Sequence, residues 1–194
     1  MSASLLRPAV FVDKDGTLVD DVPYNADPAL LSFRPAAPEA LARLAESGYA
    51  LVIVSNQSGI ARGLFDEAQF ARLRQALARR LLDRAGVRLT DFLYCPHAPA
   101  PDGGPQCSCR KPAPGMLLAA ARRHRLDLAR SWMVGDTLDD VEAGHRAGCR
   151  SVLYDSGGET VWRDSRLRRP EHCLGDWDEV AHHLLQAATL AAAP

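Results

Sequence analysis

AVFVDKDGTL, at residues 9–18, is the segment that says most about the architecture of this chain. Its apolar run, Ala9–Val12, predicts a short buried strand, and two carboxylates, Asp13 and Asp15, follow it directly. Carboxylates this close repel each other unless a cation lies between them. Gly16 permits a sharp turn that aims both side chains inward. The pair therefore predicts a cation site, and a solvated acidic turn is the alternative interpretation.

Outside this segment, short apolar runs alternate with longer amphipathic ones. The apolar runs predict four further strands, at Ala50–Val54, Asp91–Tyr94, Ser131–Val134 and Ser151–Leu153. The amphipathic segments predict helices at Pro38–Ser47, Asp66–Ala85, Pro114–His124, Asp139–Ala147 and Trp177–Leu190. This alternation predicts an α/β fold, a doubly wound, Rossmann-like parallel sheet in three α/β/α layers. We find no internal repeat or linker, and expect residues 1–194 to form a single domain.

Polar residues able to do chemistry follow four of the five predicted strands. They are Asp13 and Asp15, Ser55, Cys95, and Asp136. In an open parallel sheet, ligands bind beyond the carboxyl ends of the strands, and those ends share one edge. We therefore expect these side chains to converge on a single site.

Two further segments have the chemistry of phosphate binding. VSNQSG, residues 54–59, offers the hydroxyl of Ser55 and freed backbone N–H groups such as that of Asn56. A plain helix N-cap is the alternative interpretation. Arg110 and Lys111 precede a proline, and can clamp a phosphate as a bidentate fork and a point charge. A solvated loop explains the same two cations.

The segment MVGDTLDD, residues 133–140, adds a second acidic group. Magnesium binds a few carboxylate oxygens and keeps water and substrate phosphate as its other ligands. Asp136, at the tip of a strand, can complete the magnesium site begun by Asp13. Asp140 lies one helical turn later and can hold a metal-bound water from outside the ligand shell. Asp139 is expected to cap the helix instead.

Four potential zinc ligands gather in one loop. They are Cys95, His97, Cys107 and Cys109. Three thiols and one imidazole suit a closed tetrahedral Zn²⁺ site, which is structural rather than catalytic. Buried or incidental thiols are the alternative. Zinc would fold the Pro/Gly-rich loop at 95–109 and would place Arg110 and Lys111 at the phosphate. The remaining cysteines, Cys149 and Cys173, are expected in the core.

Together and in this order, four motifs resemble those of the haloacid dehalogenase superfamily of phosphatases. They are Asp-x-Asp-Gly-Thr at 13–17, Ser55, Lys111, and Gly-Asp-x-x-x-Asp at 135–140. The resemblance runs from about Val10 to Leu153. It implies a magnesium-dependent phosphoric monoester hydrolase.

The resemblance also implies a role for each site residue. Asp13 would attack phosphorus and form an aspartyl phosphate, while Asp15 would protonate the leaving oxygen and then take a proton from water. Mg²⁺ would be bound by the carboxylates of Asp13 and Asp136 and by the backbone carbonyl of Asp15. The phosphoryl oxygens would be held by Ser55, the N–H of Asn56, and Lys111.

The loop segments Cys95-Pro96-His97, CSCRKPAPGM at 107–116 and NQSGIARG at 56–63 sharpen the resemblance. They resemble a zinc-loop group without a large cap domain that acts on D-glycero-D-manno-heptose 1,7-bisphosphate. The implied reaction removes the 7-phosphate of this small sugar phosphate. Histidinol phosphate, the substrate of related phosphatases, or another sugar phosphate is the alternative.

Two residues depart from the pattern of that group. Thr137 stands where a lysine near the substrate is common, which leaves the sugar open. Lys14 stands where arginine is usual, and we expect it to point away from the phosphate. Gly157–Arg169 is compatible with a mobile flap near the site or with a surface turn.

Two other functional classes are compatible with these motifs. A phospho-acceptor signalling module also uses an aspartate, an acidic metal site, a hydroxyl and a lysine on a parallel sheet. Asp15 argues against it, because an acid/base two residues from the nucleophile speeds hydrolysis. A zinc-stapled binding protein without activity would release no phosphate in the presence of magnesium.

Composition limits the partners of the chain. The 194 residues are 47% apolar and 24% charged, with a formal net charge of −1, which is typical of a globular domain and not of a nucleic-acid binder. No apolar run reaches the roughly 18–20 residues that span a bilayer. We expect a cytoplasmic monomer, with no membrane or nucleic-acid partner and no disulfides among its five cysteines.

Overall fold

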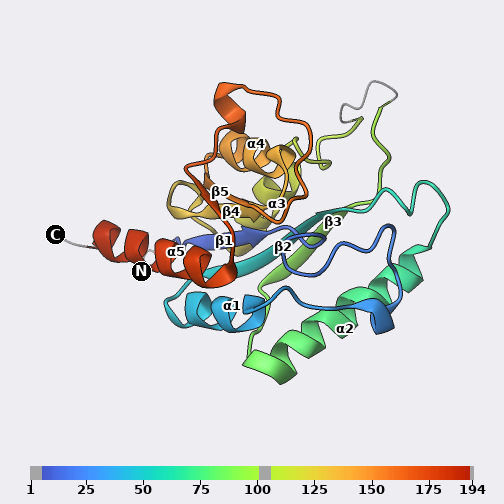
Figure 1. Ribbon diagram of the computed structural model, residues 1–194, viewed down its shortest axis with the longest axis horizontal. Helices are drawn as coiled ribbons and strands as arrows, with labels where there is room; N and C mark the ends of the chain where they lie inside the picture. The colour runs from blue at the N-terminus through green and yellow to red at the C-terminus, as the bar shows by residue number, and fades with distance from the viewer. Residues whose placement is uncertain (1–5, 101–105, 193–194) are drawn as a thin grey trace.

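The computed structural model describes residues 6–100 and 106–192, and its centre is a six-stranded parallel sheet (Figure 1). The strands are β1 (Ala9–Val12), β2 (Ala50–Asn56), β3 (Asp91–Cys95), β4 (Trp132–Gly135), β5 (Arg150–Tyr154) and β6 (His172–Leu174). Their spatial order is β3-β2-β1-β4-β5-β6, so the chain winds outward from β1 in both directions. This is the Rossmann order, and it places a switch point between β1 and β4.

Helices cover both faces of this sheet and form the outer layers. They are α1 (Ala37–Glu46), α2 (Glu67–Ala85), α3 (Gly115–His124), α4 (Leu138–Ala147) and α5 (Trp177–Ala192). Short 3₁₀ turns occur at Pro28–Leu30, Leu128–Arg130 and Arg166–Arg168. Figure 1 shows α1 and α2 below the sheet and α3 and α4 above it, while α5 lies at the left and packs against α1. The predicted doubly wound, three-layer α/β/α class is therefore confirmed, and the described residues form no large cap domain.

Strand alternation divides the core into two halves. Val10 and Val12 point into the cluster beneath α1, α2 and α5, whereas Ala9 and Phe11 point into the cluster beneath α3 and α4. All four residues of β1 are buried. A strand buried on both faces must be apolar throughout, which is why β1 shows no polar alternation.

The predicted strands and helices are present, with no boundary shifted by more than two residues, and one strand was missed. β6 pairs with β5 at the edge of the sheet, with Leu153 opposite Cys173. It is three residues long and its central residue, Cys173, is exposed. The expectation that Cys173 lies in the core is therefore wrong, whereas Cys149 is buried as expected. A short strand that pairs on one side carries too little apolar pattern to be recognised.

Helix caps fix how α2 and α4 begin. Asp66 accepts a hydrogen bond from the backbone N–H of Gln69, whose side chain accepts one from the N–H of Asp66, a reciprocal capping box. In α4 the cap is Thr137, whose backbone N–H and hydroxyl both donate to Asp140 Oδ2, at 3.2 and 2.6 Å. The prediction that Asp139 caps this helix is wrong, because its carboxylate instead forms an ion pair with Arg168, 2.6 Å away.

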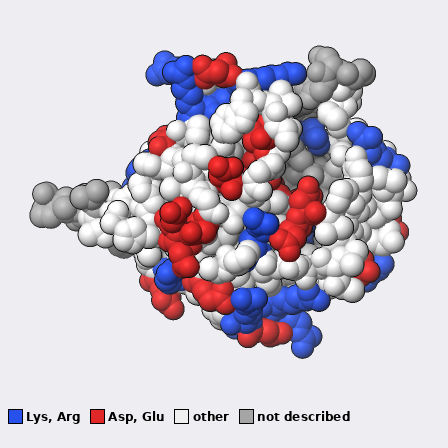
Figure 2. Space-filling model, in the orientation of Figure 1, with Lys and Arg blue, Asp and Glu red and all other residues white. Residues whose placement is uncertain are grey.

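Among the helices in the described ranges, none combines the length and the apolar character that crossing a bilayer requires. Figure 2 shows acidic and basic side chains interspersed over one face of the molecule rather than one continuous basic surface. Part of the predicted zinc loop, residues 101–105, and the ends of the chain lie outside the described residues.

Candidate active site

Three carboxylates from two segments of the chain meet at the carboxyl end of the sheet. Asp13 follows β1, Asp136 follows β4, and Asp140 lies in the first turn of α4. One oxygen of each lies within 4.8 Å of the others, and all three residues are buried. β1 and β4 are neighbours in the sheet, so the topology itself brings Asp13 and Asp136 together.

Two glycines allow the backbone to approach Asp136 closely. A Cβ atom on Gly16 would lie 2.2 Å from Oδ2 of Asp136, and Gly16 also has a positive φ of 78°. A Cβ atom on Gly158 would lie at the same distance from the same oxygen. The Asp136 carboxylate also accepts a hydrogen bond from Thr17 Oγ1 at 3.1 Å. The chain thus encloses Asp136 from two sides and fixes the direction of its oxygens.

Lys111 is the cation buried inside this acidic centre. Its ammonium pairs with Asp13 and with Asp140 Oδ1, the latter at 2.5 Å, and donates to the carbonyl of Val54 at 2.9 Å. Burial alone would lower the pKa of Lys111, but these two carboxylates raise it above its ordinary value. The side chain of Asn56 also holds the backbone of Lys111 through two hydrogen bonds, at 3.0 and 3.1 Å. Lys111 is therefore charged and fixed at this site.

The acidic centre holds more negative charge than Lys111 can neutralise. Burial raises the pKa of the Asp13 carboxyl well above its ordinary value, against the opposing charge of Lys111. Burial likewise raises the pKa of Asp136 to about 6, and the charge of Asp140 adds to the rise. A divalent cation between Asp13 and Asp136 would relieve this repulsion. The carboxylate donors present therefore fit a hard cation such as Mg²⁺.

The third carboxylate, Asp140, is already engaged by the protein on both of its oxygens. Oδ1 contacts the Lys111 ammonium, and Oδ2 accepts from the hydroxyl of Thr137 at 2.6 Å. Its ion pair with Lys111 neutralises the Asp140 carboxylate, whereas the oxygens of Asp136 accept from the uncharged hydroxyls of Thr17 and Ser156. That Asp140 also holds a metal-bound water remains a prediction.

Asp15 lies apart from the three clustered carboxylates and is partly exposed to the cavity. One oxygen pairs with the ammonium of Lys14, which is buried, and the other accepts from Gln57 Nε2 at 2.8 Å. Gln57 donates to Ser55 Oγ at 2.8 Å as well, so it links the predicted acid/base to the predicted phosphate hydroxyl. The sequence predicts no role for Gln57, and predicts only that Lys14 points away from the phosphate. Lys14 is not among the described residues that line the cavity, but it pairs with Asp15.

The predicted site residues open onto one cavity of about 750 Å³. Its wall includes Asp13, Asp15, Asn56, Arg110, Lys111, Asp136 and Asp140. It also includes residues of the segment predicted as a flap or a turn, among them Gly158, Glu159 and Arg163. Of the five side chains predicted to converge, Asp13, Asp15 and Asp136 line this cavity. Ser55 is buried and bound to Gln57, and Cys95 belongs to the group of four predicted zinc ligands instead.

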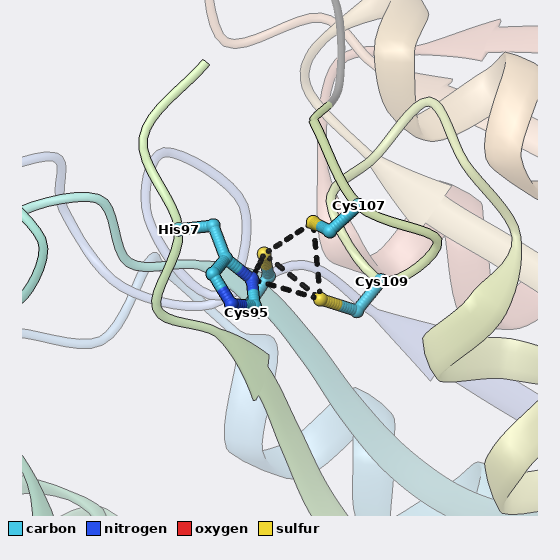
Figure 3. Close-up of side chains that lie close together, drawn as sticks. All are labelled: Cys95, His97, Cys107 and Cys109. Atoms are coloured by element: carbon cyan, nitrogen blue, oxygen red, sulfur yellow. Dashed lines mark hydrogen bonds between the residues drawn. The ribbon is translucent and has the colours of Figure 1, made fainter. Parts of the chain in front are cut away.

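The four predicted zinc ligands also come together (Figure 3). Cys109 Sγ lies 3.1 Å from Cys95 Sγ and 3.2 Å from Cys107 Sγ, and Nδ1 of His97 lies 3.3 Å from Cys109 Sγ. These separations approach the roughly 3.8 Å edge of a tetrahedron with Zn–S bonds of about 2.3 Å. All five cysteines are free thiols. The donor set therefore fits Zn²⁺.

The sulfur cluster is joined directly to the phosphate-binding segments. Cys95 ends β3, and its carbonyl accepts from the N–H of Gln57 at 2.7 Å. Cys107 Sγ accepts from the N–H of Arg110 at 3.3 Å, and Arg110 donates to the carbonyl of His97. The position of the cluster is thus coupled to that of Arg110, one residue before Lys111.

Comparison with known proteins identifies the family. A family model described as HAD-hydrolase-like matches residues 108–186. The chain is 45% identical over 174 residues to D-glycero-beta-D-manno-heptose-1,7-bisphosphate 7-phosphatase of Escherichia coli (strain K12), which covers 88% of this chain and 87% of that protein. The protein of the same name from Photorhabdus laumondii is 47% identical over 157 residues, 79% of this chain and 83% of that one. The chain belongs to the haloacid dehalogenase superfamily of phosphatases.

Structural comparison agrees with membership of this superfamily. The crystal structure of D,D-heptose 1,7-bisphosphate phosphatase from B. bronchiseptica, complexed with magnesium and phosphate, superimposes with a TM-score of 0.77. The two are 33% identical, and the match covers 92% of this chain and 98% of that one. The haloacid dehalogenase fold expected from the four sequence motifs is confirmed.

Proposed function

We propose that this protein is a magnesium-dependent phosphatase that removes the 7-phosphate of D-glycero-D-manno-heptose 1,7-bisphosphate. The observation that carries the proposal is the buried pairing of Asp13 with Lys111 beside Asp136, at the bottom of a cavity wide enough for a sugar phosphate. Relatives 40–47% identical carry the name of that activity.

Asp13 is the nucleophile in this proposal. Its carboxylate lies beside the Lys111 ammonium, which would also pair with a phosphoryl oxygen and so bring phosphorus to the attacking oxygen. Ser55, the N–H of Asn56 and Arg110 are the remaining proposed contacts of the phosphate. Mg²⁺ held by Asp13, Asp136 and the carbonyl of Asp15 would neutralise charge on the transferring group.

Asp15 is the general acid and base. It would protonate the leaving oxygen of the sugar and then accept a proton from the water that hydrolyses the aspartyl phosphate. Lys14 and Gln57 hold one oxygen each, so the carboxylate is oriented before substrate binds. Both are positioning residues for this step.

The zinc loop at 95–109 has a structural role in the proposal. Zn²⁺ bound by Cys95, His97, Cys107 and Cys109 would fix the segment that leads into Arg110 and Lys111. We further propose that residues 1–194 form one domain that acts as a cytoplasmic monomer. Sedimentation of the purified protein tests the monomer.

A panel of phosphorylated metabolites tests the substrate directly. Phosphate release with Mg²⁺ is measured for both anomers of the heptose bisphosphate, for histidinol phosphate and for other sugar phosphates. We expect the highest kcat/KM with one heptose bisphosphate anomer. A preference for histidinol phosphate would overturn the proposed substrate, and no Mg²⁺-dependent release from any compound would overturn the hydrolase.

A further inference from the structure

The segment between β5 and β6 is tied over the active-site cavity at both ends. At its start, Glu159 Oε2 accepts a hydrogen bond at 2.7 Å from the N–H of Leu138, the first residue of α4. Ser156 Oγ approaches Asp136 Oδ2 at 3.4 Å in the same region. At its end, Arg168 forms ion pairs with two α4 carboxylates, at 2.6 and 2.7 Å. Residues between these two anchors are therefore held at the rim of the cavity.

The cations that line this cavity differ in how far their charge is already neutralised. The lining includes eight carboxylates but four cations, Arg110, Lys111, Arg163 and Arg168. Lys111 and Arg168 each pair with two carboxylates. Within the described residues, Arg110 makes no ion pair and donates only to the carbonyl of His97, while Arg163 makes neither an ion pair nor a hydrogen bond. The charges of these two arginines remain open to a ligand.

Arg163 occupies the middle of the anchored segment and is exposed. Glu159, the acidic residue of this segment in the cavity wall, accepts hydrogen bonds from two backbone N–H groups, those of Leu138 and Val161. Asp164, which follows Arg163 in the chain, pairs with Arg169. A phosphate group that approaches this carboxylate-rich wall is repelled unless a cation meets it. A guanidinium can bind such a group through two parallel hydrogen bonds.

Extending the proposed function, we propose that Arg163 is a specificity-determining residue that binds the second, non-reacting phosphate of a sugar bisphosphate. The reacting phosphate lies with Asp13 and Lys111 at the bottom of the cavity, while Arg163 lies on its wall in a different segment of the chain. Arg163 thus selects for bisphosphates without touching the reacting group.

Steady-state kinetics of Arg163→Gln with a matched substrate pair tests this inference. D-glycero-D-manno-heptose 1,7-bisphosphate carries both phosphates, and the heptose 7-phosphate carries only the reacting one. We expect Arg163→Gln to raise KM for the bisphosphate about tenfold or more and to leave kcat within about twofold. Both constants for the monophosphate should stay within about twofold, and Arg163→Lys should recover part of the bisphosphate KM.

Arg166→Gln is the matched control, because it removes the same charge from the same segment at a residue that does not line the cavity. Arg166→Gln should leave kcat and KM unchanged for both substrates. Equal effects of Arg163→Gln on both substrates, or an equal effect of Arg166→Gln, would overturn the inference. So would a wild-type protein that hydrolyses the monophosphate as efficiently as the bisphosphate, and this result would leave the phosphatase itself intact. Failure of the proposed function looks different, since wild-type protein would then release phosphate from neither compound.

Discussion

At the scale of single residues, Gly158 shows how little space surrounds Asp136. A Cβ atom there would lie 2.2 Å from the Asp136 carboxylate, and Gly158 has no positive φ that would add backbone strain. Gly158→Ala should therefore displace Asp136 and weaken activation by Mg²⁺. We expect kcat/KM to fall roughly tenfold to a hundredfold, because a misplacement of about 1 Å at a reaction centre has that effect.

The Mg²⁺ dependence of phosphate release measures this change. Gly175→Ala is the matched control, since a Cβ atom on Gly175 meets nothing within 4 Å. If both variants kept wild-type activation by Mg²⁺, the close contact between the Gly158 backbone and the Asp136 carboxylate would not matter for catalysis.

Asp15 separates a hydrolase from a phospho-acceptor module. Asp15→Asn should lower kcat by about 10²–10⁴, because general acid–base catalysis contributes that much. Phosphoenzyme should then accumulate, since water attack on the aspartyl phosphate also loses its base. Rapid-quench measurement of protein-bound phosphate follows this directly.

Asp20→Asn is the control for the Asp15 variant. Asp20 is an acidic neighbour in sequence, but it pairs with Arg34 and does not line the cavity. Its kcat should remain close to wild type. Rapid turnover that persisted in Asp15→Asn would remove Asp15 from the mechanism.

At the scale of elements, Asp91 joins the start of β3 to the end of α3. Its carboxylate accepts hydrogen bonds from His124 Nε2 at 2.7 Å, Arg123 at 2.8 Å and the N–H of Phe92 at 2.8 Å. Burial alone would raise the pKa of Asp91, but these donors outweigh it and hold the pKa below its ordinary value. A carboxyl with a lowered folded-state pKa stabilises the fold above its unfolded pKa of about 3.9. That stabilisation is lost as pH falls through the folded-state pKa.

Asp91→Asn should therefore lower the free energy of unfolding at pH 6 by about 1 kcal/mol. The effect is this small because Asp91 is partly exposed and solvent screens its ion pairs. The difference in free energy of unfolding between wild type and Asp91→Asn should narrow as pH falls below about 3.9. Denaturant unfolding at several pH values measures it. Asp83→Asn is the control, because Asp83 pairs with Arg79 on the exposed face of α2 and should contribute almost nothing. A gap that did not vary with pH would show that Asp91 does not act through its charge.

At the scale of the whole molecule, the sulfur cluster links stability to catalysis. If zinc bound there holds Arg110 and Lys111 in place, its removal should lower both the stability and the activity of the protein. We expect Cys109→Ser to lower Tm by about 4–8 °C, which corresponds to roughly 2 kcal/mol in a domain of this size. Its kcat/KM at saturating Mg²⁺ should fall as well.

Calorimetry, zinc analysis and phosphate release on one preparation measure Tm, zinc content and kcat/KM together. Cys173→Ser is the control, since Cys173 is exposed on β6 and lies outside the cluster. Wild-type Tm and activity in a Cys109→Ser protein that contains no zinc would contradict a structural role for the metal.

The outline of this molecule could be predicted from its sequence, whereas the contacts that orient the site could not. Apolar runs and the acidic residues after them locate β1, β4, Asp13 and Asp136, because each signal is local. Short β6 and the ion pair of Arg168 with α4 depend on segments about twenty or more residues apart in the chain. Long-range pairing of this kind leaves no periodic pattern in a single sequence.

The central claim is that Asp13 forms a bond to phosphorus, and chemical trapping of the acyl phosphate tests it most directly. Asp15→Asn protein is mixed with the heptose bisphosphate and Mg²⁺, quenched, and treated with borohydride, which reduces an aspartyl phosphate to homoserine. Peptide sequencing by mass spectrometry then locates the changed residue. We predict homoserine at position 13 and nowhere else. Unmodified Asp13 in protein that has turned over substrate, or a modified residue at another position, would contradict the account.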